Sequence, residues 1–196
     1  MQGPLLRRDG EGTEVAGPAL GLVETSSIAR GLVVADQMVK KAPVALVLAR
    51  PVSPGKHLVL VTGEVADVGE AMRIGLETAA HTLVDSLELA QVAPELLAAL
   101  SRKPTQPGGA VGIFETFSVA STLLAADAAA KAAEVTLCEL RLADGLGGKA
   151  YFILSGAQAD VEAGLYAAET AIPTGLLLAR ELIARPHDDL LAHLRR

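Results

Sequence analysis

The sequence predicts an α/β (α+β) fold built as a tandem duplication of one small domain, each copy running β-α-β-β-α-β. The first observation is an internal repeat: when 21–50 is aligned with 112–141, thirteen of the thirty positions are identical. The second is that each copy alternates short apolar runs with longer segments of helical periodicity, which indicates strands joined by helices. A chain of 196 residues has room for two such domains.

The repeat also defines the expected domain boundaries. Beyond Arg50 the offset between the copies grows from 91 to 93, so the second copy carries two extra residues before its Gly-Lys pair. The segment RKPTQPGG, residues 102–109, has the Pro- and Gly-rich composition of a linker. We therefore expect a flexible N-terminal tail over 1–18, a first domain over 19–101, this linker, and a second domain over 110–196.

The first half of each copy predicts a strand followed by a helix. In the first copy the apolar run 20–24 predicts the strand, and the Ser and Thr residues after it can cap a helix. Four residues recur at helical spacing in that helix, and we expect them on its buried face: Ile28, Leu32, Ala35 and Val39.

The second half predicts a hairpin, a helix and a last strand. Strands are expected over 44–49 and 57–62, with a Pro- and Gly-containing loop over 51–56. A helix over 65–78 should bury Val65, Val68, Met72 and Leu76. A strand over 83–90 and a short helix over 94–100 complete a ferredoxin-like, split β-α-β domain.

Composition excludes several classes of protein. Lys and Arg number 17 against 23 Asp and Glu, with no basic stripe, so we expect no nucleic-acid partner. No apolar run reaches the roughly 18 residues of a membrane span, and the N-terminus lacks an apolar signal core, so we expect a cytoplasmic protein. The single cysteine, Cys138, rules out an intrachain disulfide and falls inside a predicted strand, where a buried structural role is expected.

Several motifs, in order and present twice, resemble the bacterial microcompartment (BMC) shell domain. ALGLVETSSIARGLVVADQMVKKAPVALV, residues 19–47, resembles the opening strand and helix of that family. VTGEVADVGEAM, residues 61–72, is similar to its Gly-Asp-Val segment. IARPHDDLLAHL, residues 183–194, is similar to its Pro-Arg-Pro-His ending, with Ala184 at the first proline. The resemblance spans both copies in the unpermuted order.

This resemblance implies a structural role rather than an enzymatic one. Tandem members of the family form trimers whose six domains make a pseudohexamer, a tile of the shell facet with a central pore for small polar metabolites. The implied partners are two further copies of the chain and, at the tile edges, hexameric and pentameric shell proteins. The implied location is the shell of a microcompartment.

The resemblance places the loop between the second and third strands around the pore. The expected lining residues are Val52, Ser53, Pro54, Gly55 and Lys56 from the first copy, and Gly145, Leu146, Gly147, Gly148 and Lys149 from the second. Glycines let the backbone approach an axis closely, and the lysines would favour anions. Taken without the resemblance, these loops are ordinary hairpin turns.

The resemblance also indicates tile-edge contacts. Lys40 and Lys131 match the family's edge lysine at the end of the first helix, and Arg185 and His187 match its Arg-Pro-His edge segment. Lysines there can pack their alkyl stems and donate to neighbouring carbonyls. The first copy has Gln-Val-Ala-Pro, residues 91–94, in place of that segment, so the two kinds of edge should differ.

Two other functions stay open at this point. Some tandem shell proteins resemble carriers of an iron–sulfur cluster held by one pore cysteine per subunit; here Ser53 stands in that loop, so we expect no metal and no cofactor. The other open function is that of a soluble regulator or enzyme built on repeated ferredoxin-like domains. Because the four histidines are scattered without metal-ligand spacing, we expect no catalytic residues.

Overall fold

The computed structural model describes residues 17–101 and 104–194. The predicted tail 1–18 lies outside these residues except for its last two positions, and the predicted linker does so in its first two. The chain divides into two compact units, and the boundary in the sequence falls between Val92 and Ala93. Among the described residues, no helix is long and apolar enough to cross a membrane.

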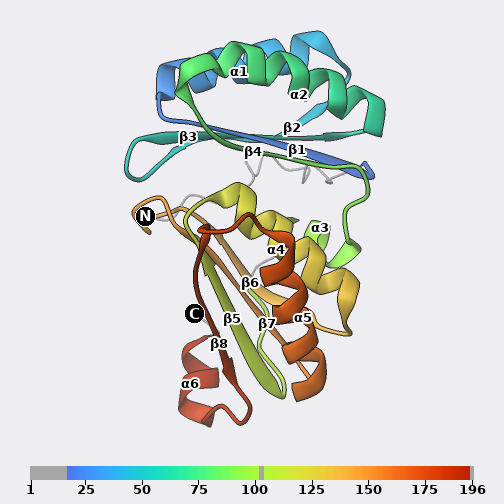
Figure 1. The fold of residues 1–196 in the computed structure, drawn as a ribbon, viewed down its shortest axis with the longest axis vertical. Helices are drawn as coiled ribbons and strands as arrows, with labels where there is room; N and C mark the ends of the chain where they lie inside the picture. The colour runs from blue at the N-terminus through green and yellow to red at the C-terminus, as the bar shows by residue number, and fades with distance from the viewer. Residues whose placement is uncertain (1–16, 102–103, 195–196) are drawn as a thin grey trace. The chain divides into compact units, whose positions relative to one another are not determined.

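The first unit is a four-stranded sheet covered by two helices. Its elements are β1 (Ala19–Thr25), α1 (Ile28–Lys41), β2 (Ala45–Val52), β3 (Lys56–Gly63), α2 (Val65–Ala79) and β4 (Leu83–Leu89), with a 3-10 turn over Ala80–Thr82. The strands lie in the order β2-β3-β1-β4 and every neighbouring pair is antiparallel. Figure 1 shows α1 and α2 side by side over one face of this sheet. This is the predicted split β-α-β topology.

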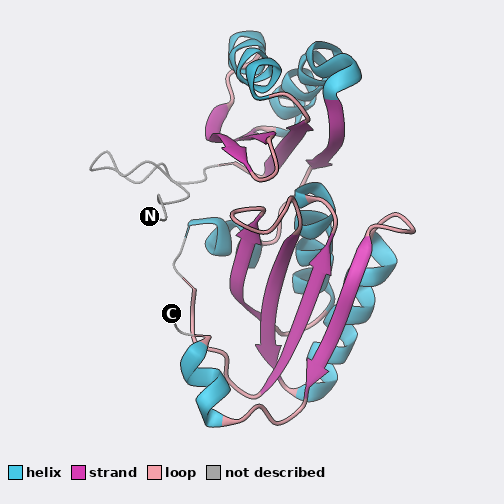
Figure 2. Cartoon of the chain, turned by 90° about the vertical axis from the view of Figure 1, so that its left-hand side faces the viewer, coloured by secondary structure: helices cyan, strands magenta, loops and turns pink. Residues whose placement is uncertain are grey.

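The second unit repeats the arrangement. Its elements are α3 (Pro94–Ser101), β5 (Ala110–Thr116), α4 (Val119–Ala132), β6 (Thr136–Leu142), β7 (Ala150–Gly156), α5 (Gln158–Ala171), β8 (Leu177–Ile183) and α6 (Asp188–His193). The strand order β6-β7-β5-β8 matches that of the first sheet, and Figure 2 shows it as a twisted sheet backed by helices. The predicted fold class is therefore confirmed in both copies.

The first helix of each unit begins in the same way. Ser27 Oγ accepts a hydrogen bond from the Arg30 amide at 3.2 Å, and Ser118 Oγ accepts one from the Ser121 amide at 3.1 Å. These bonds satisfy amides at the start of a helix that have no partner within it. The capping role expected from the Ser and Thr residues after the first strand is confirmed.

The buried face of α1 differs from the predicted one. Ile28, Leu32 and Val39 are exposed, whereas Gly31, Val34, Ala35 and Met38 face the core. The reason is the close approach of helix and sheet: a Cβ added to Gly31 would lie 2.5 Å from the ring of His57. Glycine at this one position lets α1 lie close to β3, and Val34 and Met38 fill the core on the same face of the helix.

The prediction for α2 holds in part. Val68 and Met72 are buried and Leu76 packs partly buried against the same core, but Val65 is 42% exposed. Gly75 also faces the core, because a Cβ there would lie 2.9 Å from Met38 Sδ.

The short helices α3 and α6 are equivalent in the repeat but pack differently. Thr25 pairs with Leu83 and Thr116 with Leu177, so the copies are offset by 94 residues at their last strands. At this offset Leu96-Leu97-Ala98 aligns with Leu190-Leu191-Ala192. Although α3 follows the first copy, it packs on α4 and β6 of the second unit. In α6, Leu191 and the following Leu194 pack on the sheet core of their own unit.

Candidate pore hairpins and tile edges

The first candidate pore hairpin joins β2 to β3 through a three-residue tip. Pro51 and Val52 continue the ladder opposite His57 and Lys56, so the predicted loop 51–56 shortens to 53–55. The Gly55 amide donates to the Val52 carbonyl at 2.9 Å, and Gly55 adopts φ +105°, which favours glycine. Ser53, Pro54 and Gly55 are exposed, whereas the Val52 side chain is buried.

The second candidate hairpin, between β6 and β7, is longer and richer in glycine. Gly145, Gly147 and Gly148 all have positive φ, at 69°, 63° and 88°. The Lys149 amide donates to the Leu146 carbonyl at 3.3 Å. Gly145 and Gly147 are exposed, and a Cβ on either would meet nothing within 4 Å. The two hairpins therefore occupy equivalent places in the fold but present different surfaces.

The lysine that follows each hairpin forms an ion pair with a glutamate at the end of the first strand. Lys56 Nζ lies 3.4 Å from Glu24 Oε2, and Lys149 Nζ lies 3.0 Å from Glu115 Oε1. The Glu24 side chain is fully buried and that of Lys56 is 18% exposed, whereas Glu115 and Lys149 are 31% and 44% exposed. Each lysine charge is thus balanced locally, which weakens the expected preference for anions.

His57, the second residue of β3, has a fully buried side chain. Its exposure is 0%, and neither ring nitrogen has a partner among the described residues. Desolvation lowers the pKa of His57 below its ordinary value of 6.5. The second copy has Ala150 at this position, and Thr122 where the first copy has Gly31. In the first copy a glycine of the helix faces a large strand residue. In the second copy a larger helix residue, threonine, faces a small strand residue, alanine.

The second copy also places a polar pair where the first has leucines. Tyr151 Oη donates to Glu139 Oε1 at 2.8 Å, and burial together with that carboxylate raises the pKa of Tyr151 to about 12. The repeat equivalents are Leu58 and Leu48, both buried.

The residues present do not fit an iron–sulfur cluster. Neither hairpin contains a cysteine. Cys138 is 3% exposed within β6, and its sulfur lies 3.2 Å from Ser155 Oγ. Its predicted buried position is confirmed. Over residues 17–101 and 104–194, no group of three or more His, Cys, Asp or Glu side chains could hold a metal ion.

The predicted edge residues lie at helix ends. Lys40 and Lys131 stand in the last turns of α1 and α4, and each pairs with the aspartate one turn earlier, Asp36 or Asp127. Arg185 and His187 lie between β8 and α6, both exposed. The structure brings the two lysines to equivalent positions but does not bring either lysine next to Arg185 or His187 within one unit.

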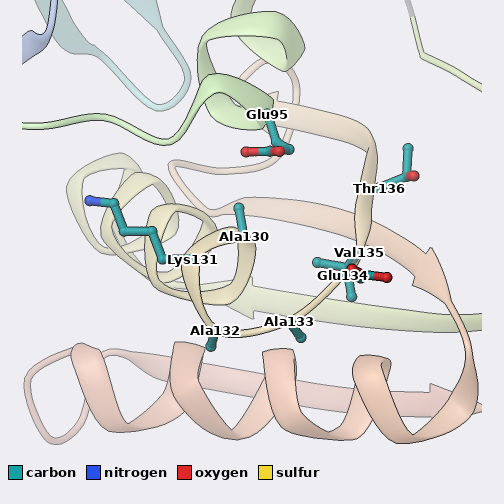
Figure 3. A pocket seen from close by; sticks show the side chains of 8 residues that line it. All are labelled: Glu95, Ala130, Lys131, Ala132, Ala133, Glu134, Val135 and Thr136. Atoms are coloured by element: carbon teal, nitrogen blue, oxygen red, sulfur yellow. The ribbon is translucent and has the colours of Figure 1, made fainter.

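Lys131 borders an open pocket of about 620 Å³ at the end of α4 (Figure 3). Glu95 from α3 and Glu134 from the turn after α4 contribute carboxylates to its lining. The carbonyl end of a helix and two carboxylates favour a positively charged group. The lining of the pocket thus combines these two carboxylates with Lys131 at the end of α4.

Sequence reasoning missed one buried contact. Asp127 Oδ1 accepts a hydrogen bond from the Ala93 amide at 2.7 Å, while Asp127 Oδ2 binds Lys131. Asp36 and Asp127 are identical between the copies, which was the available signal. Its partner is a backbone amide, and no residue type in the sequence marks a backbone donor.

Comparison with known proteins identifies the family. The BMC domain family matches residues 19–92 and 110–186. The chain is 41% identical to the bacterial microcompartment shell protein PduT of Citrobacter freundii, over 88% of this chain and 95% of that protein. It is 34% identical to the carboxysome assembly protein CcmO of a Synechococcus strain, over 88% of this chain and 67% of that protein.

Solved structures agree. A microcompartment protein from Desulfitobacterium hafniense superimposes with a TM-score of 0.80 at 44% identity, over 89% of this chain and 98% of that one. A fused, permuted hexameric shell protein has a TM-score of 0.60 at 21% identity and shows the fold alone. BMC shell proteins assemble with other shell proteins into oligomeric tiles. The chain belongs to the BMC domain family, as a tandem-domain structural protein of a microcompartment shell.

Proposed function

We propose that three copies of this chain close into a pseudohexameric tile of six BMC domains with a central pore. The hairpin tips of both copies surround the pore, and the helix ends that carry Lys40 and Lys131 lie at the tile edge. The domains of this tile are 19–101 and 110–196, joined by 102–109. Neighbouring tiles, hexameric and pentameric, contact the edges.

The observation that carries the trimer is a difference in exposure between equivalent helix faces. Ile28 and Leu32 on α1 are 42% and 56% exposed, whereas their equivalents on α4, Val119 and Leu123, are fully buried. An exposed apolar stripe of this kind indicates a surface that is covered in the assembled protein. A head-to-tail ring that covers α1 in each copy closes without free ends.

The hairpin tips supply a pore of mixed polarity. Ser53 contributes a hydroxyl, and the exposed glycines of the second hairpin contribute backbone amides. Because Lys56 and Lys149 are paired with Glu24 and Glu115, the rim carries little net charge from these four residues. This favours the passage of small polar metabolites without a strong selection by charge.

The edge proposal combines the lysines with the pocket beside Lys131. Arg185 and His187 lie on an exposed segment and can reach a neighbouring tile. The acidic lining contributed by Glu95 and Glu134 suits a guanidinium group such as that of Arg185. An edge of the second-copy type thus offers both an acceptor pocket and a basic donor.

Native mass and sheet formation test the proposal together. Light scattering should give three times the chain mass of 20.1 kDa, or twice that trimer if two tiles stack. Electron microscopy should show flat hexagonal arrays. Lys131→Ala should abolish the arrays and keep the trimer mass, while Arg73→Ala, at an exposed basic residue of α2, should keep both. A monomer or dimer mass would overturn the trimer, and arrays that survive Lys131→Ala would overturn the edge.

A further inference from the structure

The carboxylates of Asp36 and Asp127 are equivalent in the repeat but not equally satisfied. Asp127 is 6% exposed and uses both oxygens: Oδ1 accepts from the Ala93 amide and Oδ2 from Lys131. Asp36 is 48% exposed, and its bonds to Lys40 and Gln37, at 2.7 and 3.3 Å, both use Oδ2. Among the described residues, Asp36 Oδ1 has no hydrogen-bond partner.

The repeat identifies the donor that Asp36 lacks. Ala93 is the residue before α3, and at the offset of 94 its equivalent is His187, the residue before α6. The segments that follow share the sequence Leu-Leu-Ala. Leu96 at the start of α3 is fully buried, but its equivalent Leu190 is 38% exposed. The α6 segment therefore has an uncovered apolar residue where the α3 segment has a covered one.

The charges of the two uncovered surfaces are complementary. α1 ends with Lys40 and Lys41, and α6 begins with Asp188 and Asp189. The equivalents of Lys40 and Asp189 in the α3–α4 contact are Lys131 and Glu95, and both border the same pocket. Among the described residues, α3 thus packs on α4, whereas the equivalent elements α6 and α1 both carry exposed apolar residues.

We propose that the α6 segment of one copy docks on α1 of a neighbouring copy, with the backbone N–H of His187 donating to Asp36 Oδ1. The contact reproduces between two chains the bond that Ala93 makes to Asp127 within one chain. It rests on the proposed trimer and names the residues that hold its subunits together. The His187 backbone then lies inside the tile, and its side chain, which is 80% exposed, stays available to the tile edge.

Cross-linking tests the proposal directly. The double variant Asp36→Cys/His187→Cys, treated with bismaleimidoethane, should give covalent dimers and trimers on a denaturing gel. The matched control is Ala93→Cys/Asp127→Cys, the same contact within one chain, which should give only an internally linked monomer with altered mobility. The single variants Asp36→Cys and His187→Cys control for reaction at the native Cys138, which is buried.

The native mass of the same samples separates the two proposals. A trimer mass with interchain cross-links supports the contact. A trimer mass without them overturns the contact and leaves the trimer standing, because the subunits then meet elsewhere. A link between positions 36 and 187 of one chain also overturns it. A monomer mass overturns both.

A second variant measures the bond itself. Asp36→Ala should raise the subunit dissociation constant about ten- to a hundredfold, since a hydrogen bond to a charged group is lost at each interface. Glu77→Ala is the control, because Glu77 is also an exposed helical carboxylate paired with a basic side chain, that of Arg73. An unchanged dissociation constant in Asp36→Ala would overturn the assigned bond.

Discussion

Lys56 Nζ lies 3.4 Å from Glu24 Oε2, and the Glu24 side chain is fully buried at the end of β1. The equivalent pair in the second unit, Lys149 with Glu115, is half-buried, with side chains 44% and 31% exposed. The same two residue types at the same two places in the fold therefore meet in different dielectric surroundings. Burial makes a lone charge far more costly than exposure does.

Removing one partner should consequently cost more in the first unit. Lys56→Met removes the positive charge 3.4 Å from the buried Glu24 carboxylate and should lower the free energy of unfolding by about 3 kcal/mol. Lys149→Met breaks a half-buried pair and should cost less, about 1 kcal/mol. Urea unfolding followed by circular dichroism measures both. Equal losses would mean that burial does not govern the strength of these pairs.

Ser53→Cys should bring three thiols together at the pore of the proposed trimer. Three thiolates supply most of the ligands that an iron–sulfur cluster requires, so anaerobic reconstitution should produce iron binding and visible absorbance. Ser26→Cys, at an exposed serine before α1, should bind no iron. An iron-free Ser53→Cys trimer would count against a tip position close to the axis.

The Gly31–His57 contact predicts a compensating double exchange. Gly31→Thr alone forces side-chain atoms against the His57 ring and should cost at least about 2 kcal/mol. His57→Ala alone leaves a cavity and should cost about 2 kcal/mol or more. The double variant recreates the pairing of Thr122 with Ala150, so its loss should be smaller than the sum of the two by at least about 1 kcal/mol.

The polar partners for the new threonine are already in place. Thr122 Oγ1 lies 2.5 Å from Thr116 Oγ1, and the equivalent of Thr116 in the first copy is Thr25. A double-mutant cycle from urea unfolding measures the coupling. Additive losses would show that helix and strand do not share this space.

His57 should make the first unit sensitive to acid. Because burial lowers its folded-state pKa, the unfolded chain binds a proton that the folded chain does not once the pH falls below about 6.5. Stability should therefore decrease as the pH falls from 7 toward 5. His57→Ala should flatten the pH dependence of the unfolding free energy over that interval, although its stability at pH 7 is lower. An unchanged slope in His57→Ala would assign the acid sensitivity to other groups.

The repeat made most of the fold predictable from sequence. Strands, helices and their order were expected from periodicity, and the duplicated motifs led to the family. Of the four residues predicted on the buried face of α1, Ala35 is buried and the other three are exposed. The error arose because Ile28, Leu32 and Val39 follow helical spacing as well as the true core residues do. Apolar periodicity reports burial without saying whether the covering surface is the core or another molecule. Small residues such as Gly31 carry little hydrophobic signal, yet they define the close contact with the sheet.

The candidate site was predictable only in outline. Both hairpins were located by the glycines and prolines of the sequence, but strand pairing extended through Pro51 and Val52 and left a tip of three residues. The ion pairs of Lys56 and Lys149 with Glu24 and Glu115 depend on strand register, which separates the partners by 32 and 34 residues in the chain. No local pattern connects residues so far apart.

The matched side-chain sizes of Gly31 with His57, and of Thr122 with Ala150, have a consequence for the evolution of the gene. Two similar segments in tandem invite recombination between them. A transfer of the α4 coding segment into the first half would set a threonine against the His57 ring, and the reverse transfer would set a glycine against Ala150 and open a void. Either product should fold less well than its parent. Selection against such products would keep the sequences of the two halves different, including the sequences of their hairpins.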